Sequence, residues 1–129
     1  MRTVFSKWVF TRMARIAERT GIDLRIQDSG ECDPPDLKQL DRLLQADPAI
    51  THVAVVHCET TTGMLNPVAK VGDIVKRHQR VFIVDAMSSF GGVPMDMAAI
   101  HADYLVSSAN KCIQGVPGFG FVVVSLGAL

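Results

Sequence analysis

The stretch DYLVSSANKCIQGVPGFGF, residues 103–121, joins a short apolar segment to a polar turn, a single lysine and a glycine-rich loop. Residues 104–106 have the composition of a buried strand, and the polar turn at residues 107–110 leads from them to Lys111. The loop behind the lysine can bend sharply and pass close to another group. Its glycines and its proline are Gly115, Pro117, Gly118 and Gly120.

The position of Lys111 at the end of a buried strand points to chemistry. A buried lysine is costly unless its amine is paired or used covalently, because loss of water disfavours the charged form. The neutral amine is a nucleophile, and Schiff-base formation is the reaction that uses it. The alternative is a solvated lysine on an ordinary loop. The small residues on both sides of Lys111 favour a site.

The composition of the chain is that of an ordinary globular domain. Its 129 residues suffice for one hydrophobic core, with 48% hydrophobic and 20% charged residues. Thirteen basic and thirteen acidic residues cancel, so no net charge favours nucleic acid or an anionic membrane as a partner. The apolar runs, such as residues 53–56 and 121–124, are far shorter than a membrane span.

The three cysteines, Cys32, Cys58 and Cys112, are odd in number and widely spaced. This pattern argues against a disulfide framework and for a reducing compartment, so we expect a cytoplasmic protein. A metal site built from His57, Cys58 and Cys112 is conceivable, but no pair has the close spacing that zinc ligands usually show. We therefore expect no metal ion.

Apolar residues recur at helical spacing in three segments. The first covers residues 9–20 and is followed by Gly21, in the position that ends many helices. The second opens with residues 33–35, which place two prolines in its first turn. The third begins with Asn66 as the N-cap and Pro67 as the first helical residue. The residues expected to face the core are Leu37, Leu40, Leu44, Val68, Val71 and Val75.

Short apolar segments of strand length alternate with these helices, and a short helical piece is expected at residues 95–100. The predicted strands are residues 24–27, 52–57, 81–84, 104–106 and 121–125. Their alternation with helices predicts an α/β fold with a mainly parallel sheet and helices on both faces. The last strand follows a loop with no room for a crossover helix, so we expect it to pair antiparallel. The first predicted element is a helix, so both ends of the chain look cut from a larger domain.

Polar and small residues follow three consecutive predicted strands, at the edge where open α/β sheets bind ligands. These stretches are residues 59–63, 85–89 and 107–111. Asp85 ends an apolar strand, so its carboxylate needs a cationic or hydrogen-bonding partner. It is either a turn or N-cap residue, or the partner of a ligand cation such as a pyridinium nitrogen. Lys111 fits the second alternative, because pyridoxal phosphate requires a Schiff-base lysine and an acid at its ring nitrogen.

The other residues at this edge also allow two interpretations. The threonines at residues 60–62 could form local hydrogen bonds in a turn. Met87 either packs in the core or forms an apolar wall against a flat ring, and its soft thioether suits both. None of the four histidines is assigned to catalysis.

The chain resembles known proteins at HCETTTGMLNP (residues 57–67), VDAMSSFGG (residues 84–92) and residues 103–121. These motifs are similar to those of the 2-aminoethylphosphonate:pyruvate aminotransferases of the class V pyridoxal-phosphate aminotransferase family. The resemblance implies a three-layer sandwich, the central part of the large domain of a fold-type I enzyme. It also implies pyridoxal 5′-phosphate as cofactor, and 2-aminoethylphosphonate and pyruvate as substrates. The products would be phosphonoacetaldehyde and L-alanine, in phosphonate catabolism.

The resemblance also implies roles for individual residues. Lys111 would be the catalytic residue, which binds the cofactor as a Schiff base and shuttles a proton between substrate and cofactor. Asp85 would keep the pyridine nitrogen protonated. Thr60 and Met87 match positions expected to touch the cofactor ring or its hydroxyl group. The residues implied to contact the cofactor phosphate are Asn110 and Ser108.

The family's N-terminal phosphate-binding loop and its C-terminal small domain have no counterpart in the sequence. We therefore expect residues 1–129 to form a single incomplete large domain, and the family implies a homodimer. Two alternatives stay open, namely another class V enzyme and a non-catalytic α/β module that binds a phosphorylated ligand or pairs through its sheet edges. The sequence CIQG at residues 112–115 disfavours the first, and covalent capture of an aldehyde by Lys111 would exclude the second.

Overall fold

The computed structural model describes residues 2–6, 11–30 and 32–128, which form one mixed sheet of six strands. The strands are β1 (Arg2–Ser6), β2 (Asp23–Gln27), β3 (Ile50–Val56), β4 (Val81–Asp85), β5 (Tyr104–Ser108) and β6 (Gly120–Val124). Their order in the sheet is β2-β1-β3-β4-β5-β6. All pairs are parallel except β5 with β6, which confirms the antiparallel last strand.

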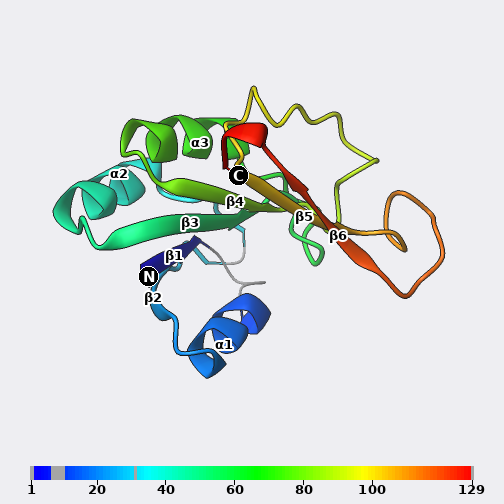
Figure 1. Ribbon diagram of the computed structural model, residues 1–129, viewed down its shortest axis with the longest axis horizontal. Coiled ribbons are helices and arrows are strands. Elements are labelled where there is room, and N and C mark those ends of the chain that lie inside the picture. Colours follow the sequence, from blue (N-terminus) through cyan, green and yellow to red (C-terminus); the bar gives the residue numbers. More distant parts are fainter. Residues whose placement is uncertain (1, 7–10, 31, 129) are drawn as a thin grey trace.

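Helices cover both faces of the sheet, as the alternating pattern predicts. They are α1 (Thr11–Arg19), α2 (Leu37–Ala46) and α3 (Val68–Arg77), and a short 3₁₀ helix follows at Leu126–Ala128. In Figure 1, α2 and α3 lie above the sheet and α1 lies below it. The three-layer α/β sandwich is therefore confirmed. Within the described residues, no helix has the length and apolar character needed to cross a membrane.

The larger core lies between the sheet and the helices α2 and α3. The predicted inward residues contribute to it, with Leu40 and Val71 fully buried and Leu37 packed against its border. The other face has a smaller cluster, in which Ala17 of α1 packs with Ala54 and Val56 of β3. The strands at the middle of the sheet are thus covered on both sides, which explains their continuous apolar composition.

Helix α1 ends where the sequence predicts. The N–H of Ile22 donates to the carbonyl of Ala17 at 2.9 Å, and the N–H of Gly21 donates to that of Glu18 at 3.1 Å. Gly21 has a φ of 73°, which suits glycine because it lacks a Cβ. This double hydrogen bond is a Schellman motif, and it turns the chain into β2. The predicted first residues of this helix, 9 and 10, lie outside the described part of the chain.

The predicted starts of the next two helices are wrong. Asp36, after the prolines, is the N-cap of α2, and its side chain accepts hydrogen bonds from two backbone N–H groups of the first turn. The cap residue of α3 is Pro67, without a side-chain cap. The side chain of Asn66 donates instead to the carbonyl of Val56 at 2.8 Å. Asn66 therefore fixes the loop after β3 and does not cap a helix.

The prediction that a helix comes first is also wrong, because β1 precedes α1. Strand β1 lies inside the sheet, where Val4 pairs with Arg25 of β2 and Val53 of β3 and is fully buried. Its sequence, RTVFS, places only two apolar residues next to each other, so it lacks the continuous apolar composition that identifies β3 and β4. Its pairing on both sides, which sequence alone does not reveal, makes it a strand.

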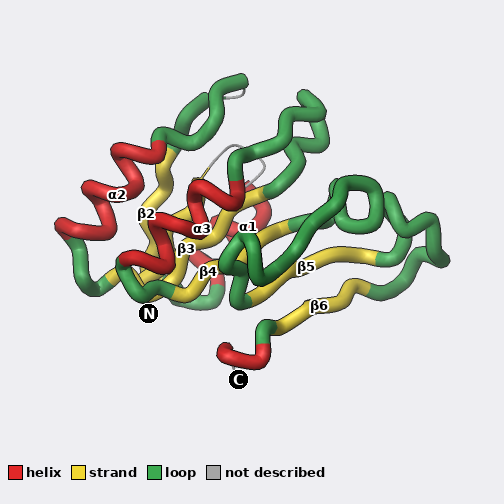
Figure 2. The backbone as a smooth tube through the Cα atoms, turned by 90° about the horizontal axis from the view of Figure 1, so that it is seen from above, coloured by secondary structure: helices red, strands yellow, loops and turns green. Residues whose placement is uncertain are grey.

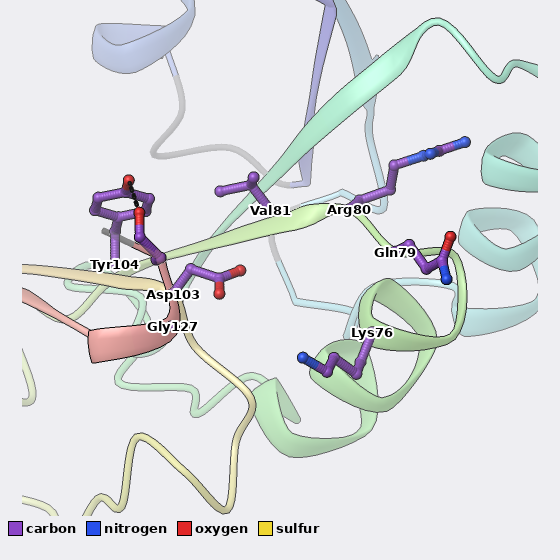
Figure 3. Close-up of a pocket in the computed structure, with 8 residues that line it drawn as sticks. Lys76, Gln79, Arg80, Val81, Asp103, Tyr104 and Gly127 are labelled. Atoms are coloured by element: carbon purple, nitrogen blue, oxygen red, sulfur yellow. Dashed lines mark hydrogen bonds between the residues drawn. The ribbon is translucent and has the colours of Figure 1, made fainter.

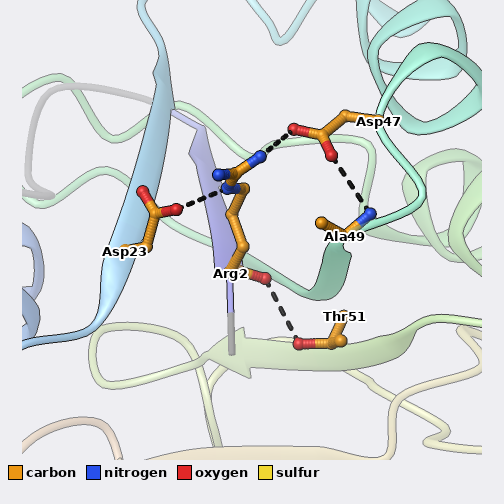
Figure 4. Close-up of polar contacts among 5 residues, drawn as sticks. All are labelled: Arg2, Asp23, Asp47, Ala49 and Thr51. Atoms are coloured by element: carbon orange, nitrogen blue, oxygen red, sulfur yellow. Dashed lines mark hydrogen bonds and ion pairs between the residues drawn. The ribbon is translucent and has the colours of Figure 1, made fainter.

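Arg2 joins the start of β1 to two neighbouring elements (Figure 4). Its guanidinium lies 2.6 Å from a carboxylate oxygen of Asp23 in β2 and 2.6 Å from one of Asp47, the C-cap of α2. The hydrogen bond from Arg2 lowers the pKa of Asp47 below its ordinary value. The hydroxyl of Thr51 donates to the carbonyl of Arg2 at 3.3 Å. This network holds one end of the sheet.

Two further predictions need correction near β5. The expected helical piece at residues 95–100 is a single turn, which ends at His101 with a φ of 56°. Ser107 and Ser108 belong to β5, although their polarity suggested a turn. The carbonyl of Ala86 accepts a hydrogen bond from the Ser107 hydroxyl at 3.3 Å, which allows this polar residue to be buried in a strand.

We expect Gly72→Ala to lower the free energy of unfolding by about 1–3 kcal/mol, because a Cβ at this position of α3 would lie 2.0 Å from the carbonyl oxygen of Ile100. Urea denaturation followed by circular dichroism measures the change. Gly127→Ala is the matched control, because a Cβ there meets no atom within 4 Å. Equal stability of the two variants would contradict the close packing of α3 on residues 97–101.

Candidate functional site

Three loops start side by side at one edge of the sheet. The register pairs Val56 of β3 with Asp85 of β4, and Asp85 with Val106 of β5, so these parallel strands end within a few residues of one another. Figure 2 shows β5 and β6 side by side, joined at this end of the sheet by the loop of residues 109–119. The polar stretches that follow the three strands therefore meet at one edge, as the sequence predicts.

Asp85 is the last residue of β4 and is half-buried. One carboxylate oxygen accepts a hydrogen bond from the N–H of Met87 at 2.9 Å, which makes a local turn. Burial raises the pKa of Asp85 above its ordinary value, and the hydrogen bond from Met87 offsets part of this effect. No cation pairs with Asp85 among the residues that the structure describes. Its carboxylate is thus suited to a cationic partner from outside the chain.

Ser88 connects this turn to both neighbouring loops, a role that the sequence analysis missed. Its hydroxyl forms a hydrogen bond of 2.7 Å with the hydroxyl of Thr60, in the loop after β3. Its carbonyl accepts a hydrogen bond of 3.3 Å from the thiol of Cys112, in the loop after β5. A Cβ on Gly92 would lie 2.9 Å from the Cys112 sulfur, so these two loops pass close to each other at this glycine. The pair of serines after Asp85 was the available signal.

His57 forms a second, buried connection between the loops after β3 and β4. Its Nδ1 lies 2.9 Å from the hydroxyl of Ser89. Only 7% of His57 and none of Ser89 is exposed. Burial lowers the pKa of His57, so its ring is neutral at neutral pH. The histidine that the sequence analysis left without a role is therefore part of the framework around the turn after Asp85.

The loop that carries Lys111 is exposed, contrary to the expectation of a buried lysine. Strand β5 ends three residues earlier, so the amine is beyond the covered part of the sheet. The N–H of Gly115 donates to the carbonyl of Ala109 at 2.8 Å, and the N–H of Gln114 donates to the carbonyl of Lys111 at 2.8 Å. These two hydrogen bonds close a compact turn. Gln114 adopts a φ of 59° to do so. Within the described residues, no acidic side chain forms an ion pair with Lys111.

The other predicted site residues lie in the same loops. Thr60 and Asn110 are exposed, and Met87 is half-buried beside Asp85. Ser108 is buried, and its hydroxyl has no hydrogen-bonding partner among the residues that the structure describes. An unpaired buried hydroxyl is unusual, and this oxygen is covered by the surrounding protein.

Of two cavities in the surface, one lies beside this edge of the sheet and the other lies at the opposite edge. A cavity of about 420 Å³ lies beside the turn after β4 and is lined by residues 90–95. A larger one of about 600 Å³ lies at the opposite ends of β4 and β5, near Lys76 and Asp103 (Figure 3). There the hydroxyl of Tyr104 donates to the carbonyl of Ala128 at 3.2 Å. None of the predicted site residues lines the larger cavity.

No group of three or more histidine, cysteine, aspartate or glutamate side chains in the described parts of the chain could hold a metal ion. Burial raises the pKa of Cys58, which disfavours the thiolate that zinc requires. The described part of this edge thus offers no cluster of metal-ligating side chains.

The class-V aminotransferase family matches residues 8–129 of the chain. Over 112 residues, or 87% of the chain, the sequence is 64% identical to a protein of Syntrophobacter fumaroxidans and 59% identical to one of Salmonella paratyphi C. Both are named 2-aminoethylphosphonate–pyruvate transaminase. The chain spans 30% of the length of each of these relatives.

The fold is shared with solved aminotransferase structures. Pyridoxamine-pyruvate aminotransferase from Mesorhizobium loti superposes with a TM-score of 0.87 at 30% identity, over 99% of this chain and 33% of that one. Alanine–glyoxylate aminotransferase from Nostoc sp. gives a TM-score of 0.89 at 26% identity, over 98% of this chain and 34% of that one. These likenesses confirm the fold that the sequence motifs implied.

We expect Asp85→Asn to raise the melting temperature of the ligand-free chain at neutral pH by a few degrees. Because the pKa of Asp85 is higher in the folded than in the unfolded state, the protonated group stabilises the fold below the unfolded pKa of about 3.9. This contribution is lost as the pH rises through the folded pKa. Asparagine stays neutral and still accepts the hydrogen bond from Met87.

Thermal melts between pH 3.5 and pH 8 test this expectation, and the advantage of the variant should grow with pH. Asp96→Asn is the matched control, because Asp96 also accepts from the N–H two residues on, at 2.8 Å, but is exposed. An advantage of Asp85→Asn that is as large at pH 4 as at pH 7 would show that the carboxylate charge is not responsible.

Proposed function

Because the chain belongs to the class-V aminotransferase family, we propose that it carries the lysine and the aspartate of a pyridoxal-phosphate-dependent site. The proposed reaction transfers the amino group of 2-aminoethylphosphonate to pyruvate and yields phosphonoacetaldehyde and L-alanine. The names of the relatives support this substrate pair. The observation that carries the proposal is Asp85, a half-buried carboxylate without a cationic partner in the described residues, one strand away from Lys111.

The residues at this edge of the sheet fit pyridoxal 5′-phosphate. The carboxylate of Asp85 matches the positive charge of a protonated ring nitrogen. The side-chain amide of Asn110, exposed in the loop after β5, can donate to a phosphate oxygen. The amine of Lys111 is exposed and can reach an aldehyde. When bound, the cofactor supplies an electron sink for the carbon that bears the substrate amine.

Each residue then has a distinct task. Asp85 holds the proton on the ring nitrogen, and the turn to Met87 keeps its carboxylate in place. Lys111 binds the cofactor covalently and moves the proton at the reacting carbon. Thr60 touches the cofactor ring or its hydroxyl group, with its orientation fixed by Ser88, and Met87 forms an apolar wall. The residues proposed to bind the phosphate are Asn110 and Ser108.

The proposal includes the setting of the site. We propose that residues 1–129 correspond to the central part of the large domain, because the chain spans about a third of its relatives. A homodimer, to which a second subunit contributes site residues, belongs to the same proposal. The three free cysteines support a reducing, cytoplasmic compartment.

We expect pyridoxal phosphate to become attached selectively to Lys111. The purified chain is incubated with the cofactor, its visible absorption is recorded, and borohydride then fixes the cofactor for peptide mapping. Lys111→Ala should reduce the label by about tenfold or more, since a positioned amine reacts far faster than a free one. Lys70→Ala, on an exposed position of α3, should leave the label unchanged. Label spread evenly over surface lysines in all three proteins would overturn the proposed function.

We expect 2-aminoethylphosphonate to change the visible absorption of the cofactor-loaded chain, because its amine displaces the lysine amine. Aminomethylphosphonate, one carbon shorter, is the control for chain length. Pyruvate added afterwards should restore the first spectrum and yield alanine, which chromatography measures. An equal response to both amines would contradict the proposed substrate but not the covalent role of Lys111.

A further inference from the structure

We propose that His57 is a positioning residue, which fixes through Ser89 the turn that orients the carboxylate of Asp85. The purpose of this orientation, to hold a ring nitrogen, rests on the proposed function. The contacts that produce it do not depend on that function. They form a chain of hydrogen bonds from β3 to the turn after β4.

The backbone of His57 ties the two strands together just beyond their ends. Its N–H donates to the carbonyl of Asp85 at 2.8 Å, which extends the β3–β4 ladder by one residue. Its carbonyl accepts the N–H of Asn66 at 2.8 Å, so the loop after β3 returns to this point. His57 is therefore held on both sides before its side chain makes any contact.

The ring of His57 reaches across to the buried hydroxyl of Ser89, 2.9 Å from Nδ1. Both residues are buried, so the loss of this hydrogen bond leaves a polar group with little access to solvent. The ring is neutral, because burial lowers its pKa. Its effect on Asp85 is thus one of geometry and not of charge. The nearest acidic residue in sequence, Glu59, makes its own hydrogen bond with the side-chain amide of Asn66 at 3.2 Å.

Ser89 closes the turn that follows Asp85. Its N–H donates to the carbonyl of Ala86 at 3.1 Å, and its carbonyl accepts the N–H groups of Gly92 and Val93 at 3.0 and 2.9 Å. Two successive turns therefore share this residue. Movement of Ser89 would displace both of them.

The carboxylate of Asp85 depends on the first of these turns. The N–H that orients it belongs to Met87, which lies between Ala86 and Ser89. A shift of Ser89 would thus move the donor that points at the carboxylate. The complete path runs from the ring of His57 to Ser89, through the turn to Met87, and from there to Asp85.

Three substitutions separate this role from simple packing. His57→Leu removes the hydrogen bond and keeps the bulk of the side chain. His57→Asn places a polar atom close to the position of Nδ1. Ser89→Ala removes the same bond from the other side, together with the longer bond of 3.5 Å from the Ser89 hydroxyl to the carbonyl of Ala86. His52→Leu is the matched control, because His52 lies in β3 itself and its ring, within the described residues, forms its hydrogen bond with the adjacent hydroxyl of Thr51 and not with Ser89.

The first readout needs no cofactor and uses the whole chain. Amide hydrogen exchange at Met87 should be faster by about tenfold in His57→Leu and in Ser89→Ala, because the turn opens more often. The double variant should exchange no faster than Ser89→Ala, because Ser89→Ala already removes the bond that His57→Leu breaks. Exchange at Val84, inside β4, should not change. His57→Asn and His52→Leu should resemble the unmodified chain.

The second readout measures the affinity for pyridoxal phosphate and for its 1-deaza analogue, in which carbon replaces the ring nitrogen. His57→Leu should weaken binding of pyridoxal phosphate by about tenfold, the effect of a misplaced charge partner. Binding of the analogue should change by less than about twofold, because it offers Asp85 no ring nitrogen. If His57 had only a general structural role, His57→Leu would weaken the binding of both ligands equally.

The outcomes distinguish this inference from the proposed function. Unchanged exchange at Met87 in His57→Leu and Ser89→Ala would overturn the positioning role, even if Lys111 is labelled. Faster exchange without any binding of pyridoxal phosphate would support the positioning role and overturn the proposed function. If His57→Leu fails to fold, Ser89→Ala and His57→Asn still decide the question. The inference requires faster exchange at Met87 in Ser89→Ala and unchanged exchange in His57→Asn.

Discussion

The parallel register of β3, β4 and β5 is the constraint on which the site depends. It pairs Val56 with Asp85 and Asp85 with Val106, so that three loops leave the sheet from neighbouring points. Burial fixes the register, because a slip by one residue would turn Val84 and the other core side chains to the opposite face. The side chains of Ser88 and Ser89 then need to span only the gap between adjacent loops. Packing in the core therefore determines where the three loops of the candidate site lie.

The fold could be predicted from the sequence wherever a local signal decides the structure. Apolar segments of strand length gave β3 and β4, and Gly21 marked the end of α1, because both signals lie in a few consecutive residues. Strand β1 was missed because its sequence, RTVFS, lacks the continuous apolar composition of β3 and β4. Asparagine is a common helix cap, but the side chain of Asn66 donates to a carbonyl of β3 instead.

The site could be predicted only in part, for a similar reason. Asp85 was identifiable because a charged residue that ends an apolar strand is costly, and the structure places it half-buried. The exposure of Lys111 could not be predicted, because it depends on how the loop leaves β5. The roles of His57 and Ser88 were also hidden. Each is defined by a hydrogen bond to a residue about thirty positions away, which no spacing rule describes.

The antiparallel pairing of β6 has a consequence for the order of folding. Strands β5 and β6 are joined by the loop of residues 109–119 alone, whereas every parallel pair in the described sheet requires a longer crossover. Because the entropy cost of closing a loop grows with its length, we expect this hairpin to form early, with Lys111 already in its turn. The loop that carries Lys111 comes to lie beside the end of β4, where Asp85 is, only when the hairpin docks along β4. Completion of the sheet and assembly of the site are then a single event.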